Sequence, residues 1–579
     1  MKRLVENKQL SRYLFILSFL AIALLIIENG FVLPSQAEII ILIIYGILLS
    51  AGISMTILRL VYKKTTNIRL IVFDLVSVSF ILFCIFKQIT LQHSYHIITD
   101  WIRVAVIVKW VREMITRRLY YKRSLINPAQ LFIISFLVMI LCGTFLLILP
   151  ESTHNGISFI DAFFMSTSSV CVTGLGVVDV SAYFTHFGQT VIMLLIQAGG
   201  LGILTFASYF AYFFKGGATY ENQLALSDIS SSGKIGEVFT TLRRILIITF
   251  LIEFIGACFI YINLDKTFIP GFGDRVYFAV FHAISSFCNA GFSTMPKGMM
   301  DGELIFNYPL QLTMVLIFVF GGLGFPIMIN ILRYIKYFIK RYVLWFVSGE
   351  NNYRAWVMTL SSKINLITTL VLIVVGTSAF FIMEYSNSLA AHNGSGKIVT
   401  ALFSATTPRS AGLNTIDFSS LHMSTIILII LLMWIGASPA STGGGIKTST
   451  FAIATLNFIS LAKGKSKIEL FRREVADISV RRAFATMTLS FVAIGTGICF
   501  LSHFENDASL LEIAFECVSA YCTVGLTLGI TPELSDPGKI VLIALMFTGR
   551  VTMLSILIAF FKKVRPMSYQ YPTDEIMIN

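Results

Sequence analysis

Four short stretches of mostly small and hydroxyl-bearing residues recur along the chain, each ending in a glycine, and their backbone could bind a cation. We call them the glycine stretches: Val170-Cys171-Val172-Thr173-Gly174, Phe287-Cys288-Asn289-Ala290-Gly291, Pro408-Arg409-Ser410-Ala411-Gly412 and Tyr521-Cys522-Thr523-Val524-Gly525. A tight loop that turns its carbonyl oxygens toward an axis needs backbone angles that a Cβ atom disfavours, and glycine permits them. Rings of such oxygens can replace the hydration shell of an ion.

The spacing of these stretches indicates a fourfold repeat. Their glycines lie 117, 121 and 113 residues apart. A second glycine follows each stretch by 25, 30, 24 and 24 residues, at Gly199, Gly321, Gly436 and Gly549. A single glycine in an apolar helix is usually a packing site. Two features that recur four times in the same order instead predict four non-identical copies of one unit.

The elements that position the stretches are apolar spans. The chain is 56% hydrophobic and only 13% charged, which is typical of membrane proteins. Each unit has one span before its stretch and one after it. The first spans are about 130–150, 245–262, 364–384 and 483–501, and the second are about 189–214, 308–332, 424–461 and 538–561. Because basic clusters occur only at the other ends of the spans, each stretch must enter the membrane and return to the same side.

We therefore predict an all-α polytopic membrane protein. It has four tandem helix–pore loop–helix repeats around one pore, plus three or four extra N-terminal transmembrane helices. The predicted boundaries are 1–125 for the N-terminal extension, 126–240, 241–360 and 361–480 for the first three repeats, and 481–579 for the fourth with a short C-terminal tail.

The charge distribution favours a membrane over nucleic acid as the surrounding of this chain. The net charge of +13 comes from clusters of Lys and Arg between apolar spans, which is the positive-inside pattern. The windows on the side of the glycine stretches hold 15 acidic and six basic residues. Such an acidic mouth would concentrate cations; alternatively, acids are merely tolerated on that side. The scattered cysteines and histidines form no metal or catalytic pattern, and we expect no enzyme activity and no cofactor.

The third unit differs from the others. Its second span is 38 residues long, and glycines with a proline interrupt it between 436 and 446. These residues break an α-helix, so we predict two half-helices joined by a loop below the stretches. The candidate functional residues of this small-residue loop are Gly436, Ser438, Pro439, Ser441, Gly443, Gly444 and Gly445. The plainer interpretation is an ordinary cytoplasmic loop between two helices.

Four charged residues inside or beside the predicted membrane region invite specific hypotheses. Arg550 lies midway along the last span, where an unpaired charge is costly, and we expect it to face water or a partner. We expect Lys447 at the cytoplasmic interface, and Arg409 behind its stretch, facing acids such as Asp417. Glu516 is either a brace for the fourth stretch or an acid of the outer mouth.

The N-terminal extension has clear spans at about 13–33, 38–61 and 70–90. A further segment, 101–118, carries basic residues at 103, 109, 112, 117 and 118. One interpretation is a fourth crossing similar to a voltage-sensor helix, with Asp74 as a counter-charge. The other, which we favour, is an amphipathic helix lying on the inner membrane surface.

Taken together, these features resemble the Trk/Ktr/HKT superfamily of potassium transporters, and most of all its TrkH and KtrB type. The resemblance covers roughly 125–565 and rests on the four glycine stretches, on Trp434–Thr448 with its glycine triplet, and on Gly549-Arg550. Family members usually carry a glycine–proline pair shortly after the arginine, and this chain does not.

The resemblance implies a function for each part. The glycine stretches would form the selectivity filter, the only place where K⁺ binds, and the 436–446 loop with Arg550 would form the gate, in which Arg550 touches the loop and opposes cation flow. Members with serine at the first glycine tend to favour Na⁺, so four glycines imply K⁺. The resemblance also implies a homodimer that docks on a cytosolic nucleotide-binding ring of the RCK, TrkA or KtrA type. Plausible docking surfaces are the basic linkers 215–244, 333–363 and 463–482, although the positive-inside pattern alone accounts for their charge equally well.

We thus predict potassium uptake through a gated four-repeat filter in the inner (cytoplasmic) membrane, with membrane lipid and no nucleic acid as neighbours. The first alternative is a sodium or mixed-cation conductor on the same scaffold. The second is a polytopic membrane enzyme or receptor whose glycines serve packing only.

Overall fold

The computed structural model describes residues 8–31, 34–62, 75–84, 86, 101–110, 128–215, 238–265, 268–348, 358–553 and 556–557. Most of these residues are helical. Three helices in the described part are long and apolar enough to cross a membrane, namely Arg243–Asn263, Leu360–Glu384 and Asp477–Phe504. A fourth candidate is a bent pair, Tyr308–Leu323 with Phe325–Val343. The chain is a helical, multi-pass membrane protein.

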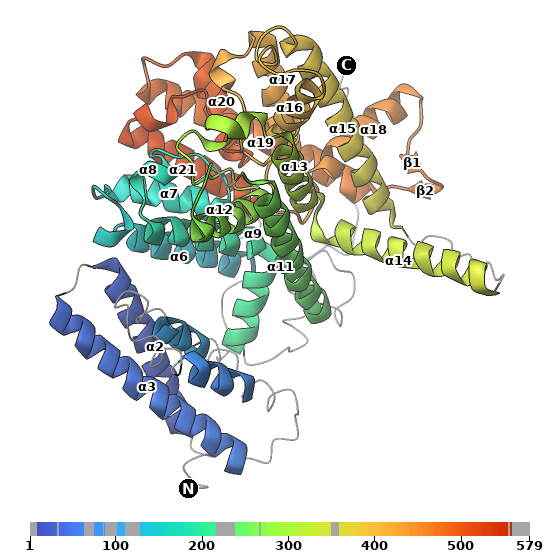
Figure 1. Ribbon diagram of the computed structural model, residues 1–579. Helices are drawn as coiled ribbons and strands as arrows, with labels where there is room; N and C mark the ends of the chain where they lie inside the picture. The colour runs from blue at the N-terminus through green and yellow to red at the C-terminus, as the bar shows by residue number, and fades with distance from the viewer. Residues whose placement is uncertain are drawn as a thin grey trace, which may run out of the picture.

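From residue 128 onward the same order of elements occurs four times: a long helix, a short helix, an extended loop and a further helix (Figure 1). The first set is α6 (Pro128–Leu147), α7 (Phe159–Cys171) and α9 (His186–Lys215). The second is α11 (Val238–Asn263), α12 (Phe272–Cys288), α13 (Tyr308–Leu323) and α14 (Phe325–Ser348). The third is α15 (Leu360–Glu384), α16 (Ser395–Thr406), α17 (Met423–Trp434) and α18 (Thr448–Ala462). The fourth is α19 (Asp477–Phe504), α20 (Leu510–Tyr521) and α21 (Asp536–Val551).

The remaining described elements are short. They are the 3-10 helices η1 (Pro150–Ser152), η3 (Gly298–Met300), η4 (Gly302–Phe306), η5 (Thr407–Arg409), η6 (Phe418–Ser420) and η7 (Thr531–Glu533), the short α-helix α8 (Val180–Tyr183), and the hairpin strands β1 (Glu469–Leu470) and β2 (Arg473–Glu474).

The four sets are arranged in a closed cycle. Helix α9 of the first set packs on α12 of the second, and α13 of the second packs on α16 of the third. Helix α17 then packs on α20, and α21 of the fourth set returns to α7 of the first. One continuous cluster of buried apolar residues runs through all four sets. This order brings the four short helices, and the loops that follow them, toward a shared centre.

Side-chain caps explain where several helices begin. The Ser509 hydroxyl and the Glu512 carboxylate form a capping box at the start of α20. The carboxylate of Glu384 accepts the His422 N–H at 3.0 Å, at the start of α17. That of Glu505 accepts the Ser535 N–H at 2.9 Å, at the start of α21. Some acids on the side of the glycine stretches therefore have structural roles.

The N-terminal region contains α2 (Lys8–Gly30), α3 (Ser35–Tyr62) and helical segments 75–84 and 101–110. All four contribute to one core, made of Ala21, Ile41, Tyr45, Leu49, Ile81, Cys84, Ala105 and Val106. Within it Arg103 pairs with Glu28 at 2.9 Å, and the Lys109 ammonium donates to the Gly52 carbonyl at 2.9 Å.

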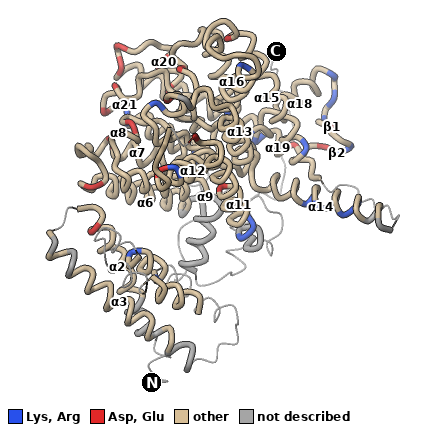
Figure 2. The backbone as a smooth tube through the Cα atoms, in the orientation of Figure 1, with Lys and Arg blue, Asp and Glu red and all other residues tan. Residues whose placement is uncertain are grey.

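Both interpretations of the segment 101–118, the surface helix and the fourth crossing, stay predictions, and the structure describes its residues 101–110. These residues pack among other helices because Ala105 and Val106 complete the shared core. The proposed counter-charge at position 74 lies outside the described residues. Figure 2 shows Lys and Arg on α14 and on the β1–β2 hairpin, while residues 216–237 of the linker 215–244 and residues 349–357 of the linker 333–363 lie outside the described residues. The predicted domain boundaries stay predictions.

Candidate functional site

The four glycine stretches meet at one place and close into a ring. Each glycine abuts the carbonyl oxygen of the residue before the glycine in the next stretch. A Cβ atom placed on Gly174, Gly291, Gly412 or Gly525 would lie 2.3, 3.2, 2.1 or 2.2 Å from the carbonyl oxygen of Ala290, Ala411, Val524 or Thr173, respectively. The contacts run from the first stretch to the second, third and fourth and back to the first. The stretches therefore surround a single axis.

The backbone of each stretch takes the same turn. All four glycines have positive φ, at +93°, +73°, +73° and +89° in chain order. The residue two positions earlier also has positive φ in every stretch, at Val172, Asn289, Ser410 and Thr523. Positive φ is uncommon for residues with a side chain. Positive φ recurs at the same two positions of all four stretches. This recurrence indicates that the shape of the loop depends on these backbone conformations.

Hydroxyl groups brace these turns from behind. The Ser168 hydroxyl accepts the Gly174 N–H, and the Ser519 hydroxyl accepts the Gly525 N–H, both at 3.1 Å. The equivalent Ser285 donates to the Phe292 carbonyl at 2.7 Å. These serines stand six residues before their glycines, a regular spacing that is visible in the sequence and that our sequence analysis did not use.

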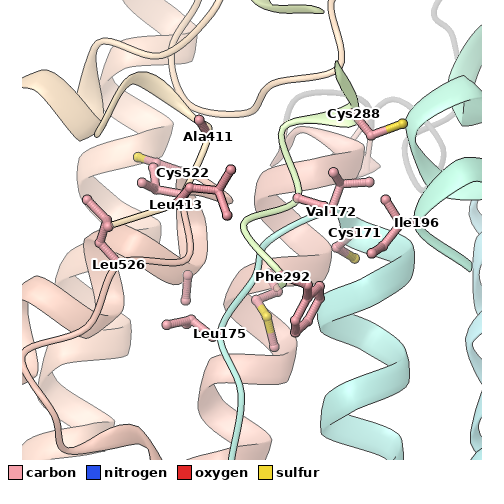
Figure 3. Packing of buried hydrophobic residues seen from close by; sticks show 14 of the residues in the cluster. Cys171, Val172, Leu175, Ile196, Cys288, Phe292, Ala411, Leu413, Cys522 and Leu526 are labelled. Carbon is pink, nitrogen blue, oxygen red and sulfur yellow. The ribbon is translucent and has the colours of Figure 1, made fainter. Parts of the chain in front are cut away.

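Apolar anchors hold the other side of each turn. The residue after every first glycine is large, apolar and buried: Leu175, Phe292, Leu413 and Leu526. Figure 3 shows these four side chains in one region, together with the buried Cys171, Cys288 and Cys522 of the stretches. Their burial leaves the backbone, and not the side chains, free to face the axis.

The second repeated glycine allows a close backbone contact. Cβ atoms placed on Gly199, Gly321 and Gly549 would lie 2.0, 2.0 and 1.8 Å from the carbonyl oxygens of Val170, Phe287 and Tyr521. Each of these carbonyls belongs to the residue four positions before the first glycine of the same unit. The helix that follows each of these stretches can therefore contact the end of the short helix only because glycine has no side chain at this position. In the third unit Gly436 instead packs against the Gly444 carbonyl, at 2.1 Å from such a Cβ.

The third unit has the predicted break between its half-helices. Helix α17 ends at Trp434 and α18 begins at Thr448. The 436–446 loop between them touches three glycine stretches. The Gly444 N–H donates to the Ser410 hydroxyl at 3.2 Å, and the Thr442 hydroxyl donates to the Phe287 carbonyl at 3.1 Å. Gly444 also lies against Thr523 of the fourth stretch.

The side chain of Arg550 holds this loop. The Arg550 guanidinium donates to the Thr442 carbonyl and, at 2.8 Å, to the Gly199 carbonyl of α9. Arg550 thus contacts the loop, as predicted. Helix α21 ends one residue later, and Thr552 has a φ of +66°.

The expectation that Lys447 lies at the cytoplasmic interface is wrong. Its ammonium turns back and donates to the Gly443 carbonyl at 2.7 Å, because the non-helical loop leaves carbonyl groups without helical partners.

The structure gives Arg409 different neighbours from those expected. Its guanidinium is buried and lies 3.5 Å from the Thr369 carbonyl and 3.4 Å from the Gly436 carbonyl. The exposed Asp417 instead caps a short turn by accepting the Ser419 N–H. The predicted pairing with Asp417 is therefore wrong, although Arg409 does lie behind its stretch.

Glu516 braces the fourth stretch, which was one of the two alternatives for this residue. Its side chain is fully buried and accepts hydrogen bonds from the hydroxyls of Thr527 and Thr531. Both threonines belong to the chain that leaves the stretch, so the carboxylate ties α20 to this segment.

A few buried polar atoms in the site remain unsatisfied by protein. Among the residues that the structure describes, the hydroxyls of Thr173, Thr523 and Ser441 have no hydrogen-bond partner. Thr173 and Thr523 belong to the stretches themselves and Ser441 to the loop beside them. Buried polar groups normally find a partner, so these hydroxyls are suited to water or a cation. The described part of the chain holds no cluster of His, Cys, Asp and Glu that would suit a transition metal.

Four equivalent loops whose backbones meet around one axis are the arrangement expected of a protein that conducts cations. A family model described as TrkH, cation transport protein, matches residues 93–571 of this chain. The chain therefore belongs to the TrkH family, whose members are transporters and not enzymes.

Named relatives agree with this assignment. The Ktr system potassium uptake protein B of Bacillus subtilis is 34% identical over 472 residues, which is 81% of this chain and 98% of that protein. The potassium/sodium uptake protein NtpJ of Enterococcus hirae is also 34% identical, over 79% of this chain and 98% of its own length. The fold is similar to the crystal structure of the potassium transporter TrkH from Vibrio parahaemolyticus, with a TM-score of 0.59, 17% identity and coverage of 85% and 97% of the two chains. Helices α2 and α3 precede the family match.

Proposed function

We propose that this protein takes up K⁺ across the cytoplasmic membrane through the ring formed by its four glycine stretches. The observation that carries the proposal is the cyclic contact of each glycine with the carbonyl before the next glycine. Backbone carbonyls that face one axis can replace the hydration shell of K⁺. K⁺ is the substrate, and the proposal requires no resident cofactor.

Selectivity for K⁺ rests on the absence of side chains at Gly174, Gly291, Gly412 and Gly525. A serine at any of these positions would bring a Cβ and a hydroxyl into the ring and would change both its width and its ligands. Relatives named for potassium uptake support K⁺. The relative named for potassium and sodium uptake favours a second candidate, a mixed K⁺ and Na⁺ conductor on the same scaffold.

The 436–446 loop is proposed as the gate. It lies against three of the four stretches, and its small residues can move with little steric resistance. Arg550 and Lys447 bind two successive carbonyls of this loop, those of Thr442 and Gly443. Two positive charges at this position oppose the passage of a cation. Flux would require that the loop and these charges move aside.

We further propose a homodimer that is regulated by a cytosolic nucleotide-binding ring of the RCK, TrkA or KtrA type. The candidate contact surfaces are the basic linkers 215–244, 333–363 and 463–482. In the third, Lys465 and Lys467 already pair with Glu469 and Glu474 at 3.0 and 2.8 Å, which reduces the free charge of the hairpin.

The experiment is reconstitution of the purified full chain in vesicles loaded with K⁺, with rubidium tracer uptake as the readout. We expect tracer uptake that excess K⁺ suppresses strongly and excess Na⁺ suppresses weakly. Equal suppression by both ions would support the mixed conductor. An absence of uptake, together with no rescue of growth at low K⁺ in cells that lack their own uptake systems, would overturn the proposal.

A further inference from the structure

Helix α14 turns away from the helix that precedes it. Gly324, with a φ of +83°, separates α13 from α14, and the two helices are bent by 105°. Helix α13 leads inward from the side of the glycine stretches, so a turn near a right angle directs α14 along the membrane plane. Its 24 residues correspond to a length of about 36 Å. Figure 1 shows α14 extending away from the body of the molecule.

The two faces of α14 differ in chemistry. Its basic residues are Arg333, Lys336, Lys340 and Arg341, and its sequence contains no acidic residue. Six apolar residues are between 46% and 79% exposed: Leu332, Ile335, Phe338, Ile339, Val343 and Phe346. At 100° per residue, each group occupies an arc of about 140°, and the arcs do not overlap. Figure 2 shows basic but no acidic residues along this helix.

We propose that α14 lies in the inner membrane interface and binds the headgroups of anionic phospholipids. A helix with an exposed apolar face and a basic face lies with the first toward acyl chains and the second toward headgroups. Clustered Lys and Arg at the inner surface attract anionic lipids. The large exposed apolar face favours lipid over a soluble acidic protein as the occupant. This proposal therefore leaves only the part of the 333–363 linker that follows α14 as a candidate contact for the cytosolic ring.

The start of helix α14 is hydrogen-bonded to the 436–446 loop. Its first residue, Phe325, donates its N–H to the Ala440 carbonyl at 3.2 Å. Gly324 abuts the Pro439 carbonyl, which would lie 2.4 Å from a Cβ at that position. A lipid that fixes α14 in the interface therefore also fixes the anchor of this loop. This coupling rests on the proposed function, because it assumes that the loop controls flux.

The test uses the full chain with Arg333, Lys336 and Lys340 all changed to Gln. The matched control changes Lys562, Lys563 and Arg565 to Gln, which removes the same charge from a basic cluster outside α14 and outside the three linkers. Retained phosphatidylglycerol is measured by mass spectrometry of the purified proteins after equal exposure to phosphatidylglycerol and phosphatidylcholine. Thermal melting establishes that both variants remain folded. Rubidium uptake is then compared in vesicles with and without phosphatidylglycerol.

We expect the wild type and the control to retain phosphatidylglycerol over phosphatidylcholine, and the α14 variant to lose several-fold of it. Phosphatidylglycerol should raise uptake by the first two proteins and not by the α14 variant. Equal retention by all three proteins overturns the lipid site. A lipid difference without uptake in any vesicle would contradict the proposed function while leaving the lipid site supported.

Discussion

The guanidinium of Arg550 joins the Thr442 carbonyl of the 436–446 loop to the Gly199 carbonyl of α9. One cation from the fourth unit thus connects the loop of the third unit to a helix of the first. Gly199 is itself seated against the end of α7, which leads into the first glycine stretch. The arginine therefore holds the loop, and under the proposed function its charge would also repel an entering cation.

Replacing Arg550 with alanine should raise rubidium uptake. The change removes a buried positive charge and two hydrogen bonds to backbone carbonyls. A barrier lower by about 1.4 kcal/mol corresponds to a rate about tenfold higher. Arg550→Lys keeps the charge without the guanidinium fork, so uptake should rise much less. Unchanged uptake in the alanine variant would argue against the barrier.

Adding a methyl group to the ring should reduce uptake. In Gly412→Ala the Cβ would lie 2.1 Å from the Val524 carbonyl oxygen, and the backbone would have to move. We expect uptake to fall by about tenfold or more, since a misplaced ring of ligands raises the barrier. Gly394→Ala is the matched control: Gly394 also has positive φ, at +53°, but a Cβ there meets nothing within 4 Å. If both variants lose uptake equally, backbone strain and not the ring explains the effect.

Alanine at the second glycine should destabilise the fourth unit. A Cβ at Gly549 would lie 1.8 Å from the Tyr521 carbonyl, so α21 and α20 must separate. Overpacking of this kind costs about 1–3 kcal/mol. Gly495→Ala in α19 meets nothing within 4 Å and should stabilise by up to about 1 kcal/mol through helix propensity. Thermal melting in detergent compares the two, and equal melting temperatures would contradict the packing argument.

A pH effect is expected where the second and third units meet on the outer side. His392 is buried, and its Nδ1 lies 3.2 Å from the Tyr308 hydroxyl. Burial, and to a smaller extent the charge of Lys397, lowers the pKa of His392 below its ordinary value of about 6.5. Below that pH the unfolded chain binds a proton more readily than the folded one, so stability falls as the pH falls through 6.5 toward the folded pKa.

The measurement is the melting temperature between pH 8 and pH 5 for wild type and His392→Gln. The variant should lose part of the decline seen on acidification. His154→Gln, at an exposed position on the same side, serves as the control and should keep the wild-type decline. Parallel curves for all three proteins would refute the role of His392.

The repetition in the sequence was enough to predict the helix order and the meeting of the four glycine stretches. The reason is physical: four equivalent loops that share one side of a membrane have few ways to bury their polar backbone except around one axis. The break at 436–446 was also predictable from its glycines and proline, whereas the contact of Arg550 with this loop was predicted from the resemblance to the TrkH and KtrB type.

Other contacts depended on tertiary distances that spacing does not contain. Arg409 binds carbonyls of α15 and of the loop start, and Lys447 turns back to Gly443, because nearby backbone groups compete with distant acids. Residues 101–110 have the periodicity of a surface helix, but the same pattern also fits a helix that buries one face in a bundle. The Val170 carbonyl and Gly199 belong to two different helices, and their contact depends on how these helices pack, which spacing along the chain does not give.

The most direct test of the central claim is the ratio of K⁺ to Na⁺ permeation through the purified wild-type chain in vesicles. The four side-chain-free glycines and the carbonyls beside them predict that K⁺ passes and that Na⁺ passes far more slowly. A chain that carries neither ion would contradict the account. So would one whose ratio is unchanged when Gly291 is replaced by serine, because the ring would then not be the place where the ion is chosen.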